Sequence, residues 1–194
     1  MKNTATPPQG KANKNTNVSA EMVKAAFDAS TDLRGFFIDS LRDIYWAENA
    51  LLSALPKMVL NATSPNLATA IKDHIAVTKM QIVRLEQVFE LIGEKASGKK
   101  CEAMAGLIKE GESILEETVP GAVRDAGIIA ASQKIEHYEI ATYGTLCAFA
   151  KTLGENEAAK LLTQTLAEEK EADMMLSAVA YNAINFDAAE EDIL

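Results

Sequence analysis

Composition and periodicity predict an all-α protein whose core is a bundle of four long helices. Apolar residues make up 48% of the 194 residues and aromatic residues only 6%, with five prolines, a composition that favours helices over sheets. Four segments carry apolar residues at alternating steps of three and four, the pattern of a helix with one buried face. Tight turns join the first two segments and the last two, and a long crossover lies between the pairs.

The bulk properties exclude several classes of partner. The length suits one domain, and the net charge of −9 argues against nucleic acid or an anionic membrane as a partner. No apolar stretch approaches the roughly 20 residues of a membrane span, and no apolar run suggests a signal peptide. Cys101 and Cys147 form no CxxC motif. We therefore expect free thiols and a cytoplasmic protein.

The chain is expected to divide into three parts. Residues 1–18 are rich in Lys, Asn, Thr and Pro and are predicted to form a disordered tail. Residues 19–186 are predicted to form the helical domain, with the option of a short helix ending near Phe27. Residues 187–194 are predicted to be a frayed acidic tail.

The first helical pair follows directly. Capping residues at positions 30–32 predict a helix that runs to about Asn61, with a kink at Pro56. Its buried face is predicted to hold Phe37, Leu41, Ile44, Glu48, Leu51, Leu55 and Met58. A tight connector with Pro65 precedes the second helix, which is expected to end near Ile92, before Gly93. This helix is apolar at both ends and polar in the middle.

The second pair follows the long connection at residues 94–121. We expect one or two shorter helices within residues 101–118, and a break at Pro120. The third long helix is predicted over residues 122–153 and the fourth over residues 157–182. Two antiparallel pairs joined by one long crossover have the ferritin-like connection. The predicted fold is therefore a ferritin-like four-helix bundle with extra short helices in its crossover.

Every predicted buried face becomes polar near its middle. The polar residues are Glu48, then His74, Thr78 and Gln81, then Glu139, and finally Glu169 and Asp173. Residues 48 and 78 are about fifteen residues from the first tight turn, and residues 139 and 169 are about fifteen from the second, so each pair lies at one height. One polar layer is therefore expected to cross the core.

Carboxylates buried together in such a layer indicate a metal site. Four of them repel one another, and two divalent cations would balance their charge. The predicted ligands are Glu48, His74, Glu136, Glu139, Glu169 and Asp173, with Glu136 as a second or bridging ligand one turn before Glu139. Carboxylate oxygens with one imidazole suit iron, the expected metal, with manganese or zinc as alternatives. A hydrogen-bonded and ion-paired network without metal is the competing interpretation.

Simpler roles are open for several of these and neighbouring polar residues. His74 could be a hydrogen-bonded core residue. Thr78 and Gln81 are expected to hydrogen-bond within the layer, and His137 to lie at the surface or in a subunit contact. An ion pair is expected between Asp43 and Arg84, and the four tyrosine and tryptophan residues at positions 45, 46, 138 and 143 are expected to serve packing.

Several blocks resemble one family. They read LRDIYWAE at 41–48, KCEAMAGLI at 100–108, QKIEHYEIATYGTL at 133–146 and EEKEAD at 168–173, together with 54–58 and 74–89. Together they resemble the YciF/YciE-like proteins, a ferritin-like family long labelled as a domain of unknown function, over about residues 33–181. The resemblance implies a homodimer, an association with bacterial stress responses and a rubrerythrin-like di-metal site.

The sequence departs from the rubrerythrin pattern at two positions. Glu-x-x-His is expected on the second and fourth helices of that pattern, but Ile71 and Ala172 stand where a Glu and a second His would be. The chain also has no CxxC iron site for electron transfer. Two hypotheses follow: a di-metal protein that reacts with O2 or peroxide, or a non-enzymatic dimeric bundle.

Overall fold

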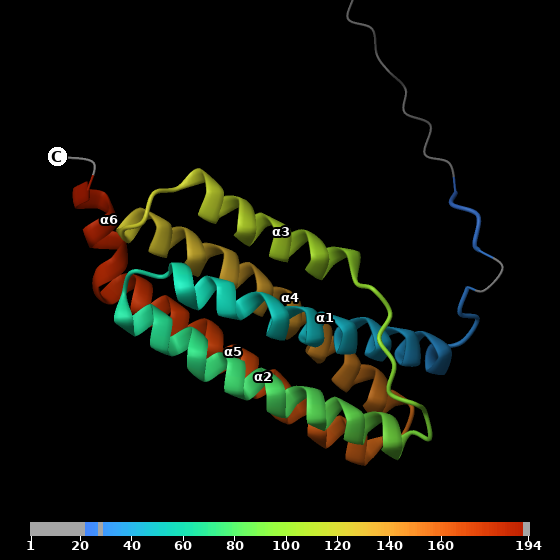
Figure 1. The fold of residues 1–194 in the computed structure, drawn as a ribbon. Coiled ribbons are helices and arrows are strands. Elements are labelled where there is room, and N and C mark those ends of the chain that lie inside the picture. Colours follow the sequence, from blue (N-terminus) through green and yellow to red (C-terminus); the bar gives the residue numbers. More distant parts are fainter. Residues whose placement is uncertain (1–21, 27–28, 192–194) are drawn as a thin grey trace, which may run out of the picture.

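The structure, a computed structural model, describes residues 22–26 and 29–191. Within these residues the chain is helical, without strands (Figure 1). The elements are α1 (Leu33–Asn61), α2 (Pro65–Leu91), α3 (Glu102–Glu117), α4 (Ala122–Thr152), α5 (Asn156–Val179), a π-helical turn (Ala180–Ile184) and α6 (Asn185–Glu191). The prediction of an all-α protein is confirmed. The tail predicted at residues 1–18 lies outside the described residues.

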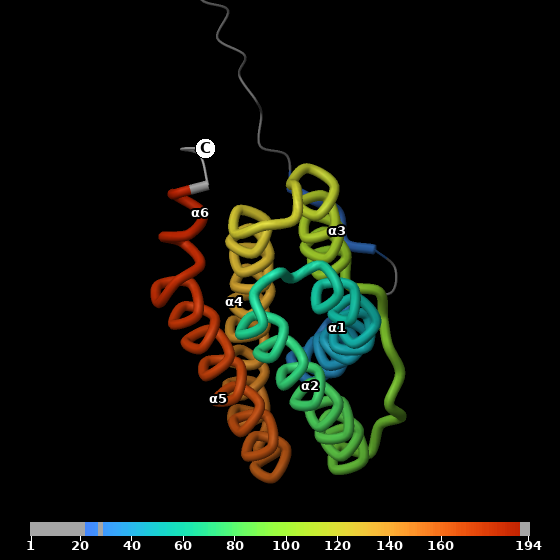
Figure 2. The backbone as a smooth tube through the Cα atoms, turned by 60° about the vertical axis from the view of Figure 1, so that its left-hand side comes forward, coloured from blue at the N-terminus to red at the C-terminus, as the bar shows by residue number. Residues whose placement is uncertain are grey.

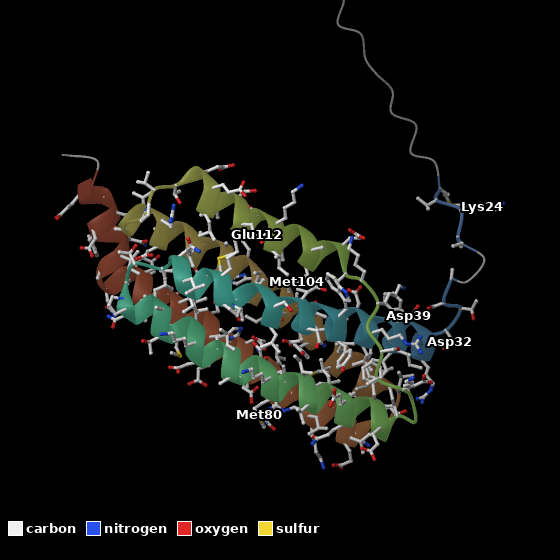
Figure 3. All side chains as sticks on the ribbon, in the orientation of Figure 1. Lys24, Asp32, Asp39, Met80, Met104 and Glu112 are labelled. Carbon is white, nitrogen blue, oxygen red and sulfur yellow. The ribbon has the colours of Figure 1, made fainter. Side chains whose placement is uncertain are left out.

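The four long helices lie side by side along one axis. α1 packs against α2 and α4, and α5 packs against the same two helices (Figures 1 and 2). The crossover returns along the bundle as α3, which lies outside α1 and α4. In Figure 3, Met104 points from α3 towards the bundle and is fully buried, whereas Met80 lies on the outer face of α2. The core therefore lies between the four long helices, with α3 covering one side.

Local capping explains where the first helices begin and end. Asp32 Oδ1 accepts a 2.8 Å hydrogen bond from the backbone N–H of Gly35 at the start of α1, as its side chain predicts. Ser64 caps α2, with Pro65 in the first turn. Gly93 follows α2 with a φ of +76°, which glycine adopts without the steric cost of a Cβ atom. The ends of α1 and α2 lie within one residue of the predicted positions.

A buried carboxylate ties the α1–α2 turn to α4. Asp125 is 2% exposed, and its two carboxylate oxygens accept hydrogen bonds of 2.7 and 2.6 Å from the backbone N–H groups of Thr63 and Ser64. Charged acceptors form the stronger class of hydrogen bond. This contact fixes the end of the first pair relative to the second pair.

The crossover holds a single helix, α3, whose first turn is capped by Cys101, in agreement with the expected one or two short helices. Two other elements differ from the sequence-based expectations. Residues 22–26 are not helical. The last helix continues through the π-helical turn as α6, which packs against α4 and reaches Glu191. Ile184 is 4% exposed and belongs to the apolar core, so it anchors this last part of the helix to the bundle. The frayed tail predicted from residue 187 is therefore helical as far as residue 191.

The buried face of α4 also rotates along the helix. Tyr143 is fully buried, whereas its neighbour Thr142 is only partly buried, although it lies seven residues after the buried Ile135. A straight helix drifts about 20° per heptad from a strict seven-residue repeat, so positions extrapolated at seven-residue spacing move gradually away from the buried face. Among the described residues, none of the helices combines the length and hydropathy that crossing a membrane requires.

Candidate metal centre

Three of the long helices deliver buried carboxylates to one level of the core. Glu48 comes from α1, Glu136 and Glu139 from α4, and Glu169 from α5, and all four are at most 3% exposed. α2 contributes His74, whose side chain is 13% exposed. The structure therefore places these five predicted residues in the core or at its edge, as the equal distances from the turns predict.

Four of the five residues form a compact group of metal-binding atoms. One ligand atom each from His74, Glu136, Glu139 and Glu169 lies within 4.8 Å of the others. His74 Nε2 is 3.6 Å from Glu136 Oε1. Protein ligands bind first-row divalent ions at about 2.0–2.2 Å, so atoms on opposite sides of one ion are about 4 Å apart. The separations within the group are therefore close to those between the ligand atoms of one ion.

Several oxygen atoms in this group lack a hydrogen-bond donor. Both oxygens of Glu139, together with Oε2 of Glu136 and Oε2 of Glu169, are buried with no partner among the described residues. Buried polar atoms almost always have a partner, and one left without a partner costs about 1–3 kcal/mol or more. Their clustering around one space fits a cation, because carboxylate oxygens and an imidazole nitrogen are its usual donors.

The acidity of the carboxyl groups reflects this crowding. Burial first, and the charge of Glu169 second, raise the pKa of Glu48 to about 8. Burial likewise raises the pKa of Glu136 to about 8 and, with the charge of Glu136, that of Glu169 to about 9. Burial and the charges of Glu48 and Glu169 raise the pKa of Glu139 well above its usual range. Without a cation, the protein would hold protons here at neutral pH.

The two histidines of the chain have different environments. Burial lowers the pKa of His74 to about 4, so its imidazole is neutral at pH 7 and keeps a lone pair for a metal. His137 is 70% exposed, which confirms its predicted surface position. Only His74 has the burial and the neighbours of a ligand.

Uncharged donors hold two of the carboxylates in place. Tyr143 donates a 2.5 Å hydrogen bond to Glu48 Oε1, and Gln81 Nε2 donates to Glu169 Oε1. The predicted hydrogen-bonding role of Gln81 is confirmed. Partners of this kind orient the carboxylates that bind metals and limit their rotation. Both donors bond Oε1, so neither occupies Oε2 of its carboxylate.

Asp173 is the one predicted ligand that the structure does not bring into this group. Its Oδ1 is 3.3 Å from His137 Nε2 and accepts a 3.2 Å hydrogen bond from Gln133 Nε2. Position 173 is four residues after Glu169, which turns it about 40° around α5, towards the outer edge of the interface with α4. Thr78 is fully buried, and its hydroxyl donates to the backbone carbonyl of His74 at 3.0 Å rather than to a carboxylate.

The predicted ion pair between Asp43 and Arg84 is wrong. Arg84 instead forms a bidentate ion pair with Glu168, in which Nη1 and Nη2 donate to the two carboxylate oxygens at 2.8 and 2.9 Å. Its face of α2 packs on α5 rather than on α1. Asp43 accepts a 3.3 Å hydrogen bond from Tyr138. The ion pair of Arg84 lies next to the acidic group, since Gln81 bonds both Glu168 and its neighbour at position 169.

Sequence reasoning missed the part that Tyr143 plays at the site. The sequence alone predicts a packing role for Tyr143, because aromatic residues in a core usually pack. Its position four residues after Glu139 places it about one turn further along nearly the same face of α4. That spacing is the signal that predicts contact with the polar layer.

Comparison with known proteins gives consistent matches. A family model described as "Domain of unknown function (DUF892)" matches residues 32–189. Protein YciF of Escherichia coli (strain K12) is 46% identical over 150 residues, 77% of this chain and 90% of YciF. The crystal structure of the E. coli stress protein YciF matches with a TM-score of 0.78 and 44% identity, covering 80% of this chain and 99% of that chain. YcfI of Rhodopseudomonas palustris, described as a proposed structural protein, matches with a TM-score of 0.76 and 42% identity, covering 79% and 98%.

Proposed function

The chain belongs to the DUF892 family, a domain of unknown function, and we propose that it is a ferritin-like protein that binds divalent metal ions in its core. The stress role attached to E. coli YciF supports a bacterial stress function for this chain. A cytoplasmic homodimer is part of the same proposal.

The observation that carries this proposal is the set of buried carboxylate oxygens without partners. Glu139 has two such oxygens, and Glu136 and Glu169 have one each. A chain that only needed a packed core would be more stable with apolar residues of similar volume at these positions. A cation that binds all three carboxylates removes their repulsion and gives each oxygen a partner.

Two ions suit the charge of the site. Glu48, Glu136, Glu139 and Glu169 carry four negative charges when ionised, which two divalent cations balance, with His74 as the nitrogen ligand. Iron is the proposed metal, with manganese or zinc as alternatives. Bound iron or manganese would supply redox chemistry towards O2 or peroxide. The chain's own part is to hold the ligands, keep the His74 imidazole neutral and exclude bulk water.

The second candidate is a dimeric bundle without metal that acts through binding or structural support. It is favoured by the closeness of the Glu136 and Glu169 carboxyl groups and by their raised pKa values of about 8 and 9, which let these acids stay protonated without a cation. The description of the relative YcfI as a proposed structural protein points the same way. In this case the acids stay protonated, and added metal has no effect on stability.

Substitution of Glu139 by Gln separates these functions. Glu139→Gln keeps the shape of the side chain but removes a ligand charge, so we expect Fe(II) or Mn(II) to raise Tm much less than in the wild type. In chelator, the variant should be as stable as the wild type or more stable, because fewer acids repel one another. The measurement is Tm by calorimetry with chelator and with each metal.

Glu90→Gln is the matched control, because Glu90 is exposed on α2 outside the acidic group. It should keep the full metal-dependent rise in Tm. If metal shifts the wild type and Glu139→Gln equally, or shifts neither, the metal-free bundle replaces the metal protein as the proposed function.

A further inference from the structure

A cavity of about 240 Å³ lies between α2, α4 and α5, beside the acidic group. Most of its surface is apolar and comes from Leu55, Ile71, Val77, Ala172, Met175 and Leu176. The lining also includes Ser132, His74 and four carboxylate residues, Asp73, Glu136, Glu168 and Glu171. Ile71 is three residues before His74, and Ala172 is three residues after Glu169. Residues three apart share a helix face, so the cavity continues the faces that carry these two polar residues.

The cavity leads from the surface to the acidic group. Ile71 and Glu136, each 3% exposed, form its buried part, whereas Met175, 46% exposed, lies at its mouth. His74 and Glu136 belong to both the cavity and the acidic group. Oε2 of Glu136 has no hydrogen-bond partner among the described residues. A molecule that fills the cavity would therefore bring one end to the candidate ligands.

The lining limits what can bind. Apolar walls favour a hydrocarbon body by removing it from water. Exposed Asp73 and Glu171 at the lining disfavour an anionic ligand. A cationic end would have to give up its hydration in the apolar inner part, where the proposed metal ions already balance the charge of the carboxylates. An engineered apolar cavity of about 150 Å³ binds benzene, so by proportion this cavity takes roughly ten non-hydrogen atoms.

We propose that this cavity is the substrate pocket of the metal centre and binds a small uncharged apolar molecule, with a hydroxyl or hydroperoxide end directed at His74 and Glu136. This inference rests on the proposed function, because only a bound metal makes the inner end a reaction site. It adds a substrate class, since a cavity for O2 or hydrogen peroxide alone needs no apolar pocket of this size.

A series of linear 1-alkanols tests the pocket, with the Co(II)-loaded chain as the reporter. From 1-butanol to 1-octanol, we expect affinity to rise about fourfold per methylene group, from about 0.8 kcal/mol per buried CH2. Each alkanol should also change the visible absorption of the bound Co(II), because its hydroxyl reaches the ligands. Hexanoate and hexylammonium should bind at least tenfold more weakly than 1-hexanol.

Filling the cavity should remove this binding. Ala172→Phe places a ring in the space and should weaken 1-hexanol binding at least tenfold, while Co(II) binding is retained, because Ala172 offers no ligand atom. Ala70→Leu, on the opposite wall, is a second and smaller filling variant. Ala167→Phe is the control, since Ala167 is exposed on α5 outside the lining, and it should bind 1-hexanol like the wild type.

The outcomes separate this inference from the proposed function. If alkanols bind with the expected length dependence but leave the Co(II) spectrum unchanged, the pocket does not serve the metal, and the inference is wrong. It is also wrong if Co(II) binds but no alkanol does, if a charged analogue binds as tightly as 1-hexanol, or if both filling variants bind like the wild type. If Co(II) does not bind at all, the proposed function itself fails, whatever the alkanols do.

Discussion

Glu139 is the residue whose surroundings most require an explanation. It is 1% exposed, both of its oxygens lack a partner among the described residues, and burial together with three other carboxylates raises its pKa. A lone buried carboxylate would be protonated or replaced by an apolar residue. Its position on α4, level with Glu48 and Glu169 on facing helices, makes a shared cation the simplest physical reason for such a group.

The raised pKa values lead to a pH prediction for the metal-free chain. A carboxyl group with a higher pKa in the folded state stabilises folding most at low pH, and this stability is lost as pH rises through the folded-state pKa. For Glu48, Glu136 and Glu169 these values are about 8, 8 and 9. With chelator present, the free energy of unfolding should therefore fall between pH 6.5 and pH 9, as measured by urea unfolding.

His74 requires the comparison to start at pH 6.5. Its pKa is lowered to about 4, so its contribution to stability is lost as pH falls from about 6.5 through 4, opposite in direction to that of the acids. Glu136→Gln should reduce the decrease in the free energy of unfolding above pH 6.5, and saturating Mn(II) should reduce this decrease further. A metal-free stability that stays constant or increases up to pH 9 would contradict the buried, repelling carboxyl groups.

Tyr143 offers a test of the contacts around the acids. Tyr143→Phe removes the hydroxyl that donates 2.5 Å to Glu48 Oε1 and leaves that buried oxygen without this donor. We expect a loss of about 1–3 kcal/mol in the free energy of unfolding, measured by urea unfolding in chelator. Tyr181→Phe is the control, because Tyr181 is 73% exposed. Equal stabilities for the two variants would mean that the Glu48 contact has no energetic role.

At the scale of the helices, much of the architecture is predictable from local signals. The start of α1 follows from Asp32, and the periodicity and turns place α2, α4 and α5 within a few residues. Rotation about each helix axis is harder to predict, because each residue turns the helix by about 100°. Spacing alone predicts Asp173 for the core, but α5 turns it towards the edge of its interface with α4.

The close crossing of α3 over α4 gives a prediction at the same scale. A Cβ atom at Gly127 would lie 2.6 Å from Cγ2 of Ile114, whereas one at Gly144, on the same helix, meets nothing within 4 Å. Gly127→Ala should therefore lower the free energy of unfolding by about 1–3 kcal/mol. Gly144→Ala should raise it by up to about 1 kcal/mol, because alanine favours the helix. Stabilisation by both changes would show that α3 does not lie this close to α4.

At the scale of the whole molecule, the polar layer was predictable and its partners were not. Counting residues from the two tight turns places Glu48, Glu139 and Glu169 at one height in an antiparallel bundle. The count cannot predict which neighbour each charged side chain meets. Arg84 pairs with Glu168 on α5 because α2 lies between α1 and α5 (Figure 2). Hydrophobic periodicity does not predict which helices are neighbours.

The metal content of the purified chain tests the central claim most directly. The wild type, prepared without chelator and dialysed against Mn(II) or Fe(II), should hold about two ions per chain by elemental analysis, as four carboxylates and an imidazole in a bundle core imply. The double variant Glu136→Gln, Glu139→Gln should retain less than a tenth of this. A wild type that binds no more metal than the double variant would contradict a metal centre in this protein.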